Sequence, residues 1–192
     1  LFFVAQEVPE GTPQTTHTPA IQIRGTHNGN SYSPPDLSTG TLSVTEPARL
    51  QVVGVHSSKA TVTQEMGTDW YILMEVENNG SSAARLDSID LQLINGVRVT
   101  QEFQIQKPVK FLGSNSTTLA AQSRDSLRFE ILNTGHTNGN TAVQGFIRVV
   151  DLSNNQKIEA RSSGNNGSFV VQSPAALNIV ALRPSQPTVT VN

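Results

Sequence analysis

The chain contains no cysteine, which excludes a structural disulfide, a thiolate metal site and a cysteine nucleophile. The lack of thiols suits both the cytosol and secreted bacterial proteins, so it does not define a compartment. Charged residues make up only 15% of the chain, and the net charge is −2. This charge balance indicates neither a nucleic-acid-binding surface nor a polybasic membrane patch.

Long hydrophobic runs are also missing. No apolar stretch approaches the roughly 20 residues of a membrane span, and the opening sequence LFFVAQ lacks the basic and long apolar regions of a signal peptide. Because the sequence does not begin with Met, we interpret Leu1 as an arbitrary starting point inside a longer polypeptide. Ser, Thr, Asn, Gln and 14 Gly supply the polar character, and this mixture favours strands and tight turns over helices.

One stretch of the chain occurs twice. Residues 40–63 read GTLSVTEPARLQVVGVHSSKATVT, and residues 167–190 read GSFVVQSPAALNIVALRPSQPTVT. Ten of the 24 aligned positions are identical, including Pro47 with Pro174, where chance would give about one or two identities. The copies lie 127 residues apart, which is too far for a solenoid repeat and is typical of one globular domain.

A weaker match links residues 1–23 with residues 127–149, with four identities at an offset of 126. We therefore interpret residues 1–47 as the last three strands of a preceding domain, 48–174 as one complete domain, and 175–192 as the first strand of a following domain. Two or three strands alone are marginally stable. We expect residues 1–47 to pack on strands from the same polypeptide or, through strand addition, from a neighbour.

Within residues 48–174 the hydrophobic pattern has the two-residue period of β-strands. Over residues 70–77, Trp70, Ile72, Met74 and Val76 alternate with Tyr71, Leu73, Glu75 and Glu77. Apolar and polar residues alternate over 89–93 and 127–131, and Asn-Gly turn signals separate such segments. We predict an all-β fold, an antiparallel β-sandwich of about seven to nine short strands with almost no helix.

Two local features of this sandwich are predicted from the same pattern. We expect an opening strand over residues 50–55 that continues over 61–64. We expect residues 97–104 to form the return strand of a hairpin that turns at Asn95-Gly96.

A motif at the end of a long strand suggests a family. The strand ends in Val76-Glu77-Asn78-Asn79-Gly80 and is followed by small residues. This pattern resembles the CARDB-type immunoglobulin-like domains, which carry a Val-x-Asn-x-Gly motif. The resemblance covers about residues 48–174 and implies an immunoglobulin-like sandwich of the kind that recurs in tandem in large secreted or surface proteins of bacteria and archaea. The family supplies no catalytic residues.

The chain has four histidines that could form a metal site: His17, His27, His56 and His136. His27 and His136 lie in similar Asn-Gly-rich turns, but no second His or Cys stands at the spacing of zinc ligands. We interpret these histidines as solvated turn residues and predict no metal and no cofactor.

The carboxylates match no calcium-binding loop. Asp87, Asp90 and Asp125 are the nearest candidates, and Asp87 and Asp90 are expected on opposite faces of a strand because they lie three residues apart. Glu75 and Glu77 share a face. A glycosidase would need two carboxylates that converge across a cleft, whereas this pattern favours a solvated sheet face. With no Gly-x-Ser-x-Gly elbow and no phosphate-binding loop, we predict no catalytic residues.

Aromatic residues make up only 5% of the chain. Trp70 could join Tyr32 and Tyr71 in a sugar-binding platform, but Trp70 is in phase with apolar strand positions, so we place it in the core. Sequons for N-glycosylation begin at the three residues Asn79, Asn115 and Asn166. In a chain so rich in Asn, Ser and Thr, such matches are expected by chance.

The domain junctions are the most informative motif. Glu46-Pro47-Ala48 and Ser173-Pro174-Ala175 each join a last strand to the next first strand without a Gly/Ser-rich spacer. Proline ends the ladder of strand hydrogen bonds, and a short connection limits the reach of the chain. The pattern favours a rod of domains in nearly constant orientation over an ordinary boundary with a hinge.

We therefore predict a structural repeat of an extracellular or cell-surface fibre, sheath or adhesin stalk, with no enzymatic activity. Its expected partners are neighbouring repeats of the same polypeptide or adjacent subunits of a homopolymer, and not nucleic acid. The alternative is a carbohydrate- or protein-binding accessory module of a secreted enzyme, whose ligand would be a glycan or a protein.

Overall fold

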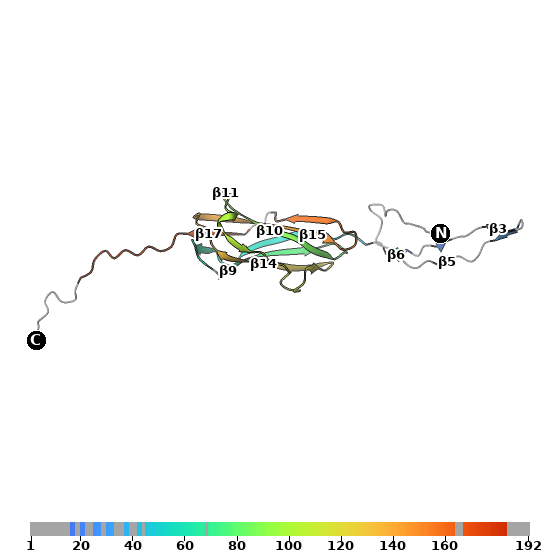
Figure 1. Cartoon of the computed structure of the whole chain (residues 1–192), viewed down its shortest axis with the longest axis horizontal. Helices are drawn as coiled ribbons and strands as arrows, with labels where there is room; N and C mark the ends of the chain where they lie inside the picture. Colours follow the sequence, from blue (N-terminus) through green and yellow to red (C-terminus); the bar gives the residue numbers. More distant parts are fainter. Residues whose placement is uncertain are drawn as a thin grey trace, which may run out of the picture.

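The computed structural model describes residues 45–67, 69–163 and 167–183, together with six short strands between residues 16 and 43. Residues 45–172 form two β-sheets that enclose one hydrophobic core (Figure 1). The first sheet has four strands, in the spatial order β12 (Gln104–Gln106), β14 (Ser123–Asn133), β9 (Trp70–Asn78) and β7 (Leu50–Ser57).

The second sheet has seven strands and is built around β15 (Gly139–Asp151). Its main path runs through β11 (Val97–Arg98), β10 (Ala84–Asn95), β15, β17 (Ser168–Gln172) and β8 (Thr61–Thr63). Two further strands pair with this path, namely β13 (Thr118–Leu119) with β10 and β16 (Lys157–Arg161) with β15. The predicted β-sandwich is therefore confirmed, although it has eleven described strands where about seven to nine were expected. The described residues contain one 3₁₀ turn, η1 (Thr100–Glu102), and no α-helix.

The core is formed by alternate residues of the long strands. In β9, every second residue from Trp70 to Asn78 is buried, and the residues between them are partly exposed. The same alternation in β14 and β15 brings Leu127, Phe129 and Val149 into the core. This pattern follows from the pleat, which directs successive side chains to opposite faces of a sheet.

Trp70 is a core residue, as predicted, with a side chain only 1% exposed. Its ring meets Phe169 edge to face at 4.9 Å between centroids, and Phe103 also packs edge to face on Phe169, at 5.9 Å. The indole N–H donates to Thr134 Oγ1 at 3.1 Å, so its polar atom is satisfied within the core. The sugar-platform role considered for Trp70 is excluded by this burial.

The opening strand differs from its prediction. Residues 50–57 form β7 in the first sheet, whereas residues 61–63 form β8 in the second sheet. β8 runs parallel to β17, while the other strand pairs within the sandwich are antiparallel. The chain changes sheets at Ser57–Ala60, where Ser57 Oγ donates to the Lys59 carbonyl at 2.7 Å and closes a tight bend. One predicted strand is therefore two strands that belong to opposite layers.

The predicted return strand over 97–104 is also wrong in its length. Only Val97 and Arg98 pair with β10, and the 3₁₀ turn follows at once. Val99 turns into the core, and Thr100 Oγ1 accepts the Leu93 N–H at 2.8 Å in place of a strand partner. These contacts end the hairpin and send the chain to β12 in the first sheet.

Before the sandwich, three short strand pairs are described, all antiparallel. They are β1 (Thr16–His17) with β6 (Leu42–Ser43), β2 (Ala20–Ile21) with β5 (Leu37–Ser38), and β3 (Gly25–His27) with β4 (Asn30–Tyr32). Taken in chain order, the stretches of residues 16–27 therefore pair with 42–43, then with 37–38, and last with 30–32.

A matched pair of leucines tests the assignment of the core. Leu127 is fully buried, whereas the side chain of Leu112 is 55% exposed. We expect Leu127→Ala to lower the free energy of unfolding by about 2–5 kcal/mol and Leu112→Ala to change it by less than about 0.5 kcal/mol. Urea denaturation followed by Trp70 fluorescence measures both effects, and equal losses would contradict the assignment.

Candidate functional site

The polypeptide enters and leaves the sandwich at opposite ends. Ala48 lies against Asp151, the last residue of β15, with its N–H 2.7 Å from Asp151 Oδ2. At the other end of the same strand, Gly139 pairs with Val171 of β17, just before the chain leaves the sandwich. β15 has 13 residues, which at about 3.3 Å per residue separates the two ends by about 40 Å. We call the Ala48 end proximal and the Val171 end distal.

At the proximal end, a buried carboxylate holds the incoming chain. Asp151 has no exposed surface, and besides Ala48 it accepts hydrogen bonds from Ser82 Oγ at 2.7 Å and from the backbone N–H and hydroxyl of Ser153, each at 2.7 Å. Burial alone would raise the pKa of Asp151, but these hydrogen bonds to the charged form outweigh it, so the pKa lies below its ordinary value.

Asn78 is the second element of this contact, and all of its hydrogen-bonding capacity is used. Its Oδ1 accepts the N–H groups of Arg49 and Gly80, each at 3.1 Å. Its Nδ2 donates to the carbonyls of Ser82 at 2.8 Å and Ala120 at 3.0 Å. The side chain is fully buried. One amide therefore ties the incoming chain to two turns of the sandwich.

Gly80 completes the contact by its lack of a side chain. A Cβ at this position would lie 2.1 Å from the Pro47 carbonyl oxygen and 2.5 Å from the Arg49 nitrogen, both backbone atoms. The incoming chain therefore passes directly over this glycine. We name the group Asn78, Gly80, Ser82 and Asp151 the junction clasp. The Asn and Gly of the Val-x-Asn-x-Gly motif thus hold the junction, a role that the sequence reading did not assign to them.

At the distal end, the outgoing chain is held by hydrogen bonds at Gln172 and Ser173. The Gln172 carbonyl accepts the Gln64 N–H at 2.9 Å, and Asn138 Nδ2 donates to Ser173 Oγ at 2.7 Å. Beyond Ser173, residues 174–183 are all exposed and extend away from the sandwich (Figure 1). The chain is therefore clasped where it enters and solvent-exposed after it leaves.

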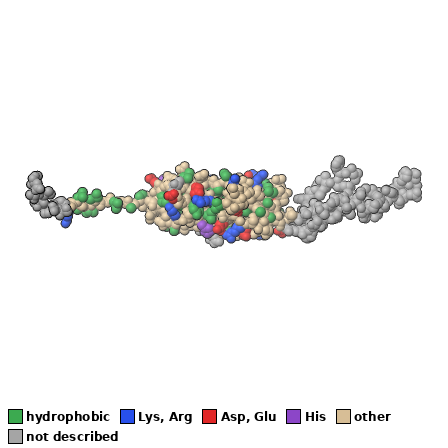
Figure 2. Space-filling view, turned by 90° about the horizontal axis from the view of Figure 1, so that it is seen from below, with side chains coloured by type: hydrophobic (Ala, Val, Ile, Leu, Met, Phe, Trp, Pro, Cys, Tyr) green, Lys and Arg blue, Asp and Glu red, His purple; other side chains and the backbone are tan. Residues whose placement is uncertain are grey.

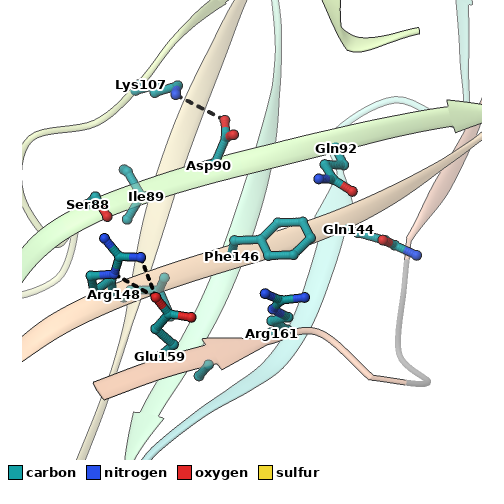
Figure 3. Close-up of a pocket in the computed structure, with 12 residues that line it drawn as sticks. Ser88, Ile89, Asp90, Gln92, Lys107, Gln144, Phe146, Arg148, Glu159 and Arg161 are labelled. Carbon is teal, nitrogen blue, oxygen red and sulfur yellow. Dashed lines mark hydrogen bonds and ion pairs between the residues drawn. The ribbon is translucent and has the colours of Figure 1, made fainter. Parts of the chain in front are cut away.

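The outer face of the second sheet carries a shallow depression of about 560 Å³ over β10, β15 and β16 (Figure 3). Phe146 lies near its centre, with the Arg161 guanidinium 5.1 Å from the ring centroid. Lys107 is 3.0 Å from Asp90.

An ion pair between Arg148 and Glu159 completes this lining. These charged side chains are each about half exposed, and such pairs contribute at most about 1 kcal/mol. The depression is therefore a solvated surface in which two basic side chains are ion-paired and a third, Arg161, lies over Phe146.

The predicted opposite placement of Asp87 and Asp90 is wrong. Asp87 is 3.3 Å from Lys157 of β16, and Asp90 lies on the outer depression. Lys157 shares its face of β16 with Glu159, which also lines that depression, so both aspartates face outward. The cause is the register shift of β10 between Leu86 and Ser88, which breaks the simple alternation.

The other candidate acids are structural. Asp125 accepts the N–H groups of Gly113 and Ser114 at 2.7 and 2.9 Å and anchors a loop. Burial alone would raise the pKa of Asp125, but these and neighbouring hydrogen bonds lower it overall. Glu75 is partly exposed on β9 and pairs with Arg124 of β14, and Glu77 lies partly exposed on the same face. The predicted solvated face is confirmed for this glutamate pair.

The histidines are scattered. His56 and His136 are exposed, and His136 Nε2 is 3.8 Å from Glu102. The side chains of His17 and His27 lie outside the described residues. Across the described part of the chain, no group of three or more metal-ligating side chains comes together.

Tyr71 is partly exposed beneath Arg128, whose guanidinium carbon lies 4.0 Å from the ring centroid. Asn79 and Asn115 are both exposed, and the backbone N–H of Asn79 donates to the Arg49 carbonyl. The side chain of Tyr32 and the predicted sequon at Asn166 lie outside the described residues. None of the helical segments that the structure describes could cross a membrane.

Solved structures are similar to this chain in fold. They include an ASH/PapD-like domain of human CEP192, with 17% identity over 66% of this chain and 89% of that chain at a TM-score of 0.33. A type I cohesin from Pseudobacteroides cellulosolvens matches with 12% identity over 69% of this chain and 98% of that chain, at a TM-score of 0.28. With the strand pairing above, the fold class is an immunoglobulin-like β-sandwich.

A third match, to the secreted serine protease VesC from Vibrio cholerae, has 12% identity and a TM-score of 0.33, and it covers 62% of this chain but only 23% of that protein. Identities this low concern the fold alone, and such TM-scores carry no inference about activity or partners. No family model matches the chain, and no curated protein matches it.

The glycine of the junction clasp allows a sharp test. Gly80→Ala would force a methyl group into the backbone at Pro47–Arg49, whereas a Cβ at Gly67 meets nothing within 4 Å. We expect Gly80→Ala to lower the free energy of unfolding by about 1–3 kcal/mol or more and Gly67→Ala to leave it nearly unchanged. Chemical denaturation measures both, and a neutral Gly80→Ala would show that the incoming chain is not held here.

Asp151 should make stability depend on pH. Because its folded pKa lies below the ordinary 3.8, its stabilising effect is fully present above that value and is lost as the pH falls through the folded pKa. We expect Asp151→Asn to be less stable by about 1–3 kcal/mol at neutral pH, with the difference shrinking in acid. Urea denaturation at pH values of about 7, 4 and 2.5 measures this. A constant difference across that range would contradict an ionised clasp.

Proposed function

We propose that this chain is a structural repeat of an extracellular or cell-surface fibre, sheath or stalk, which acts by extending and spacing and has no catalytic role. The observation that supports this proposal is that the chain enters and leaves the sandwich at opposite poles, about 40 Å apart. It enters where Ala48 contacts Asp151, and it leaves just after Val171 pairs with Gly139. A domain with this geometry lengthens an array by its full length at every repeat.

The junction sequence supports a stiff array. Only Ser173 and Pro174 separate Gln172, the last residue of β17, from Ala175, which matches the clasped Ala48. Three Cα–Cα steps span at most about 11 Å. Successive sandwiches on this plan are therefore nearly in contact, and a free hinge has little room.

The strands before the sandwich support a preceding domain of the same plan. In the sandwich, β15 pairs with β16 along one half and with β17 along the other. Residues 16–27 pair in the same way with 30–38 and with 42–43. In this proposal residues 1–47 are the last strands of that domain, and the whole chain belongs to a CARDB-like tandem array.

The alternative is a glycan- or protein-binding module, for which a row of exposed aromatic rings would be the signature. Among the described residues, the outward-facing rings are Tyr71 and Phe146. They belong to different sheets, and each lies under an arginine. The outer depression is shallow, and its charged side chains other than Arg161 are ion-paired, so the structural role is favoured.

Solution scattering tests the proposal on a longer chain. We expect the full chain with a second copy of residues 48–174 inserted after Pro174 to be longer than the parent by about 40 Å or slightly more, because the new sandwich continues the axis of the first. Small-angle X-ray scattering measures the maximum dimension.

A matched control carries a ten-residue Gly-Ser spacer between Pro174 and the inserted copy. We expect this flexible variant to give a broader distance distribution than the direct fusion. If the direct fusion instead folds back to a compact particle, or if the two variants scatter alike, the role as a stiff spacer is wrong.

A further inference from the structure

The segment after β17 exposes an unusual amount of apolar surface. The side chains of Leu177, Ile179, Val180 and Leu182 are 99%, 77%, 92% and 88% exposed, and Figure 2 shows hydrophobic side chains along this thin segment. Such a run is costly to leave in water, at about 1.5–3 kcal/mol for each large side chain that burial would remove from it. The segment therefore exposes the kind of apolar side chains that a strand normally buries against a sheet.

Its counterpart inside the sandwich is β7. In the repeat alignment Ala175 corresponds to Ala48, Ile179 to Val52 and Leu182 to Val55. The three counterparts are only 5%, 4% and 0% exposed. The same apolar positions are thus buried in one copy and exposed in the other.

The spacing of these positions is specific to β7. A register shift between Val52 and Gly54 breaks the two-residue alternation, so that Val52 and Val55, three residues apart, both face the core. The exposed segment repeats this interval with Ile179 and Leu182.

The β7 backbone also accepts the alanine of the exposed segment. Ala181 corresponds to Gly54, and a Cβ on Gly54 would meet only the His56 ring, 2.7 Å from Nε2. Because the His56 side chain is exposed, its ring can move aside. Ala181 is therefore compatible with the β7 position.

We infer that residues 175–182 are the β7 strand of a following sandwich, where they pair antiparallel with the strand equivalent to β9 and insert Ile179 and Leu182 into its core. The partner is a second unit of the kind formed by residues 56–174, and the inference rests on the proposed tandem array. Ala175 would then present its N–H to the clasp carboxylate of that unit, as Ala48 does here.

A chimaeric chain tests whether the segment can replace β7. It consists of residues 1–182 followed directly by residues 56–174, so residues 175–182 occur once and the second sandwich has no opening strand except 175–182. We expect it to fold, and we expect backbone amides at 177–182, measured by hydrogen exchange with mass spectrometry, to exchange at least about 100-fold more slowly than in the parent chain.

Substitutions in the chimaera identify which face is buried. Ile179→Asp and Leu182→Asp should abolish the slowing of exchange at 177–182 and unfold the second unit only. Asn178→Asp, which corresponds to the exposed Gln51, should change neither. If the amides of 177–182 remain unprotected, or if all three substitutions act alike, the inference is overturned.

The fusion with a complete second copy of residues 48–174 separates this failure from a failure of the proposed function. If that fusion forms an extended pair and the chimaera does not protect 177–182, the array stands and the strand assignment is wrong. If the fusion itself is compact, the proposed array fails first.

Discussion

The sandwich depends on the hydrogen bonds that a buried carboxylate and a buried amide make to backbone at its proximal end. Pro47 has no N–H to donate, so the strand ladder does not extend back through it. The N–H of Ala48 is buried beside it and needs an acceptor. Asp151 supplies that acceptor, and Asn78 supplies the acceptor for Arg49. β7 then begins in register beside β9, and the core closes between the sheets.

The sequence specifies the layers of this fold better than their connections. The two-residue period at residues 70–76 and 127–131 follows directly from the pleat, which points successive side chains to opposite faces. Those strands and their buried faces are therefore predictable. The passage of the chain from β7 to β8 across the sandwich leaves no such signal, because both strands have the same period. The register shifts in β7 and β10 also leave no recognisable pattern in the sequence. The shift in β10 is the reason that the predicted placement of Asp87 and Asp90 was wrong.

The junction clasp shows the same limit for the site. Asn78 and Gly80 were visible as a motif, but the reason for each residue is a contact with backbone 30 residues earlier, which local patterns do not encode. Asp151 carried no signal at all, since it follows a strand as many surface aspartates do. Only its complete burial, with four hydrogen bonds to one carboxylate, distinguishes it from Asp125.

The same geometry bears on how such a domain would carry tension. A pull on Pro47 acts along β7 from its proximal end, and a pull on Ser173 acts along β17 from its distal end. Antiparallel hydrogen bonds lie perpendicular to the strands, so both ladders are loaded in shear, and their bonds must fail together. Attachment at one pole would instead peel a strand away bond by bond. In the proposed stalk, the opposite placement of the points where the chain enters and leaves the sandwich would therefore both add length and distribute load.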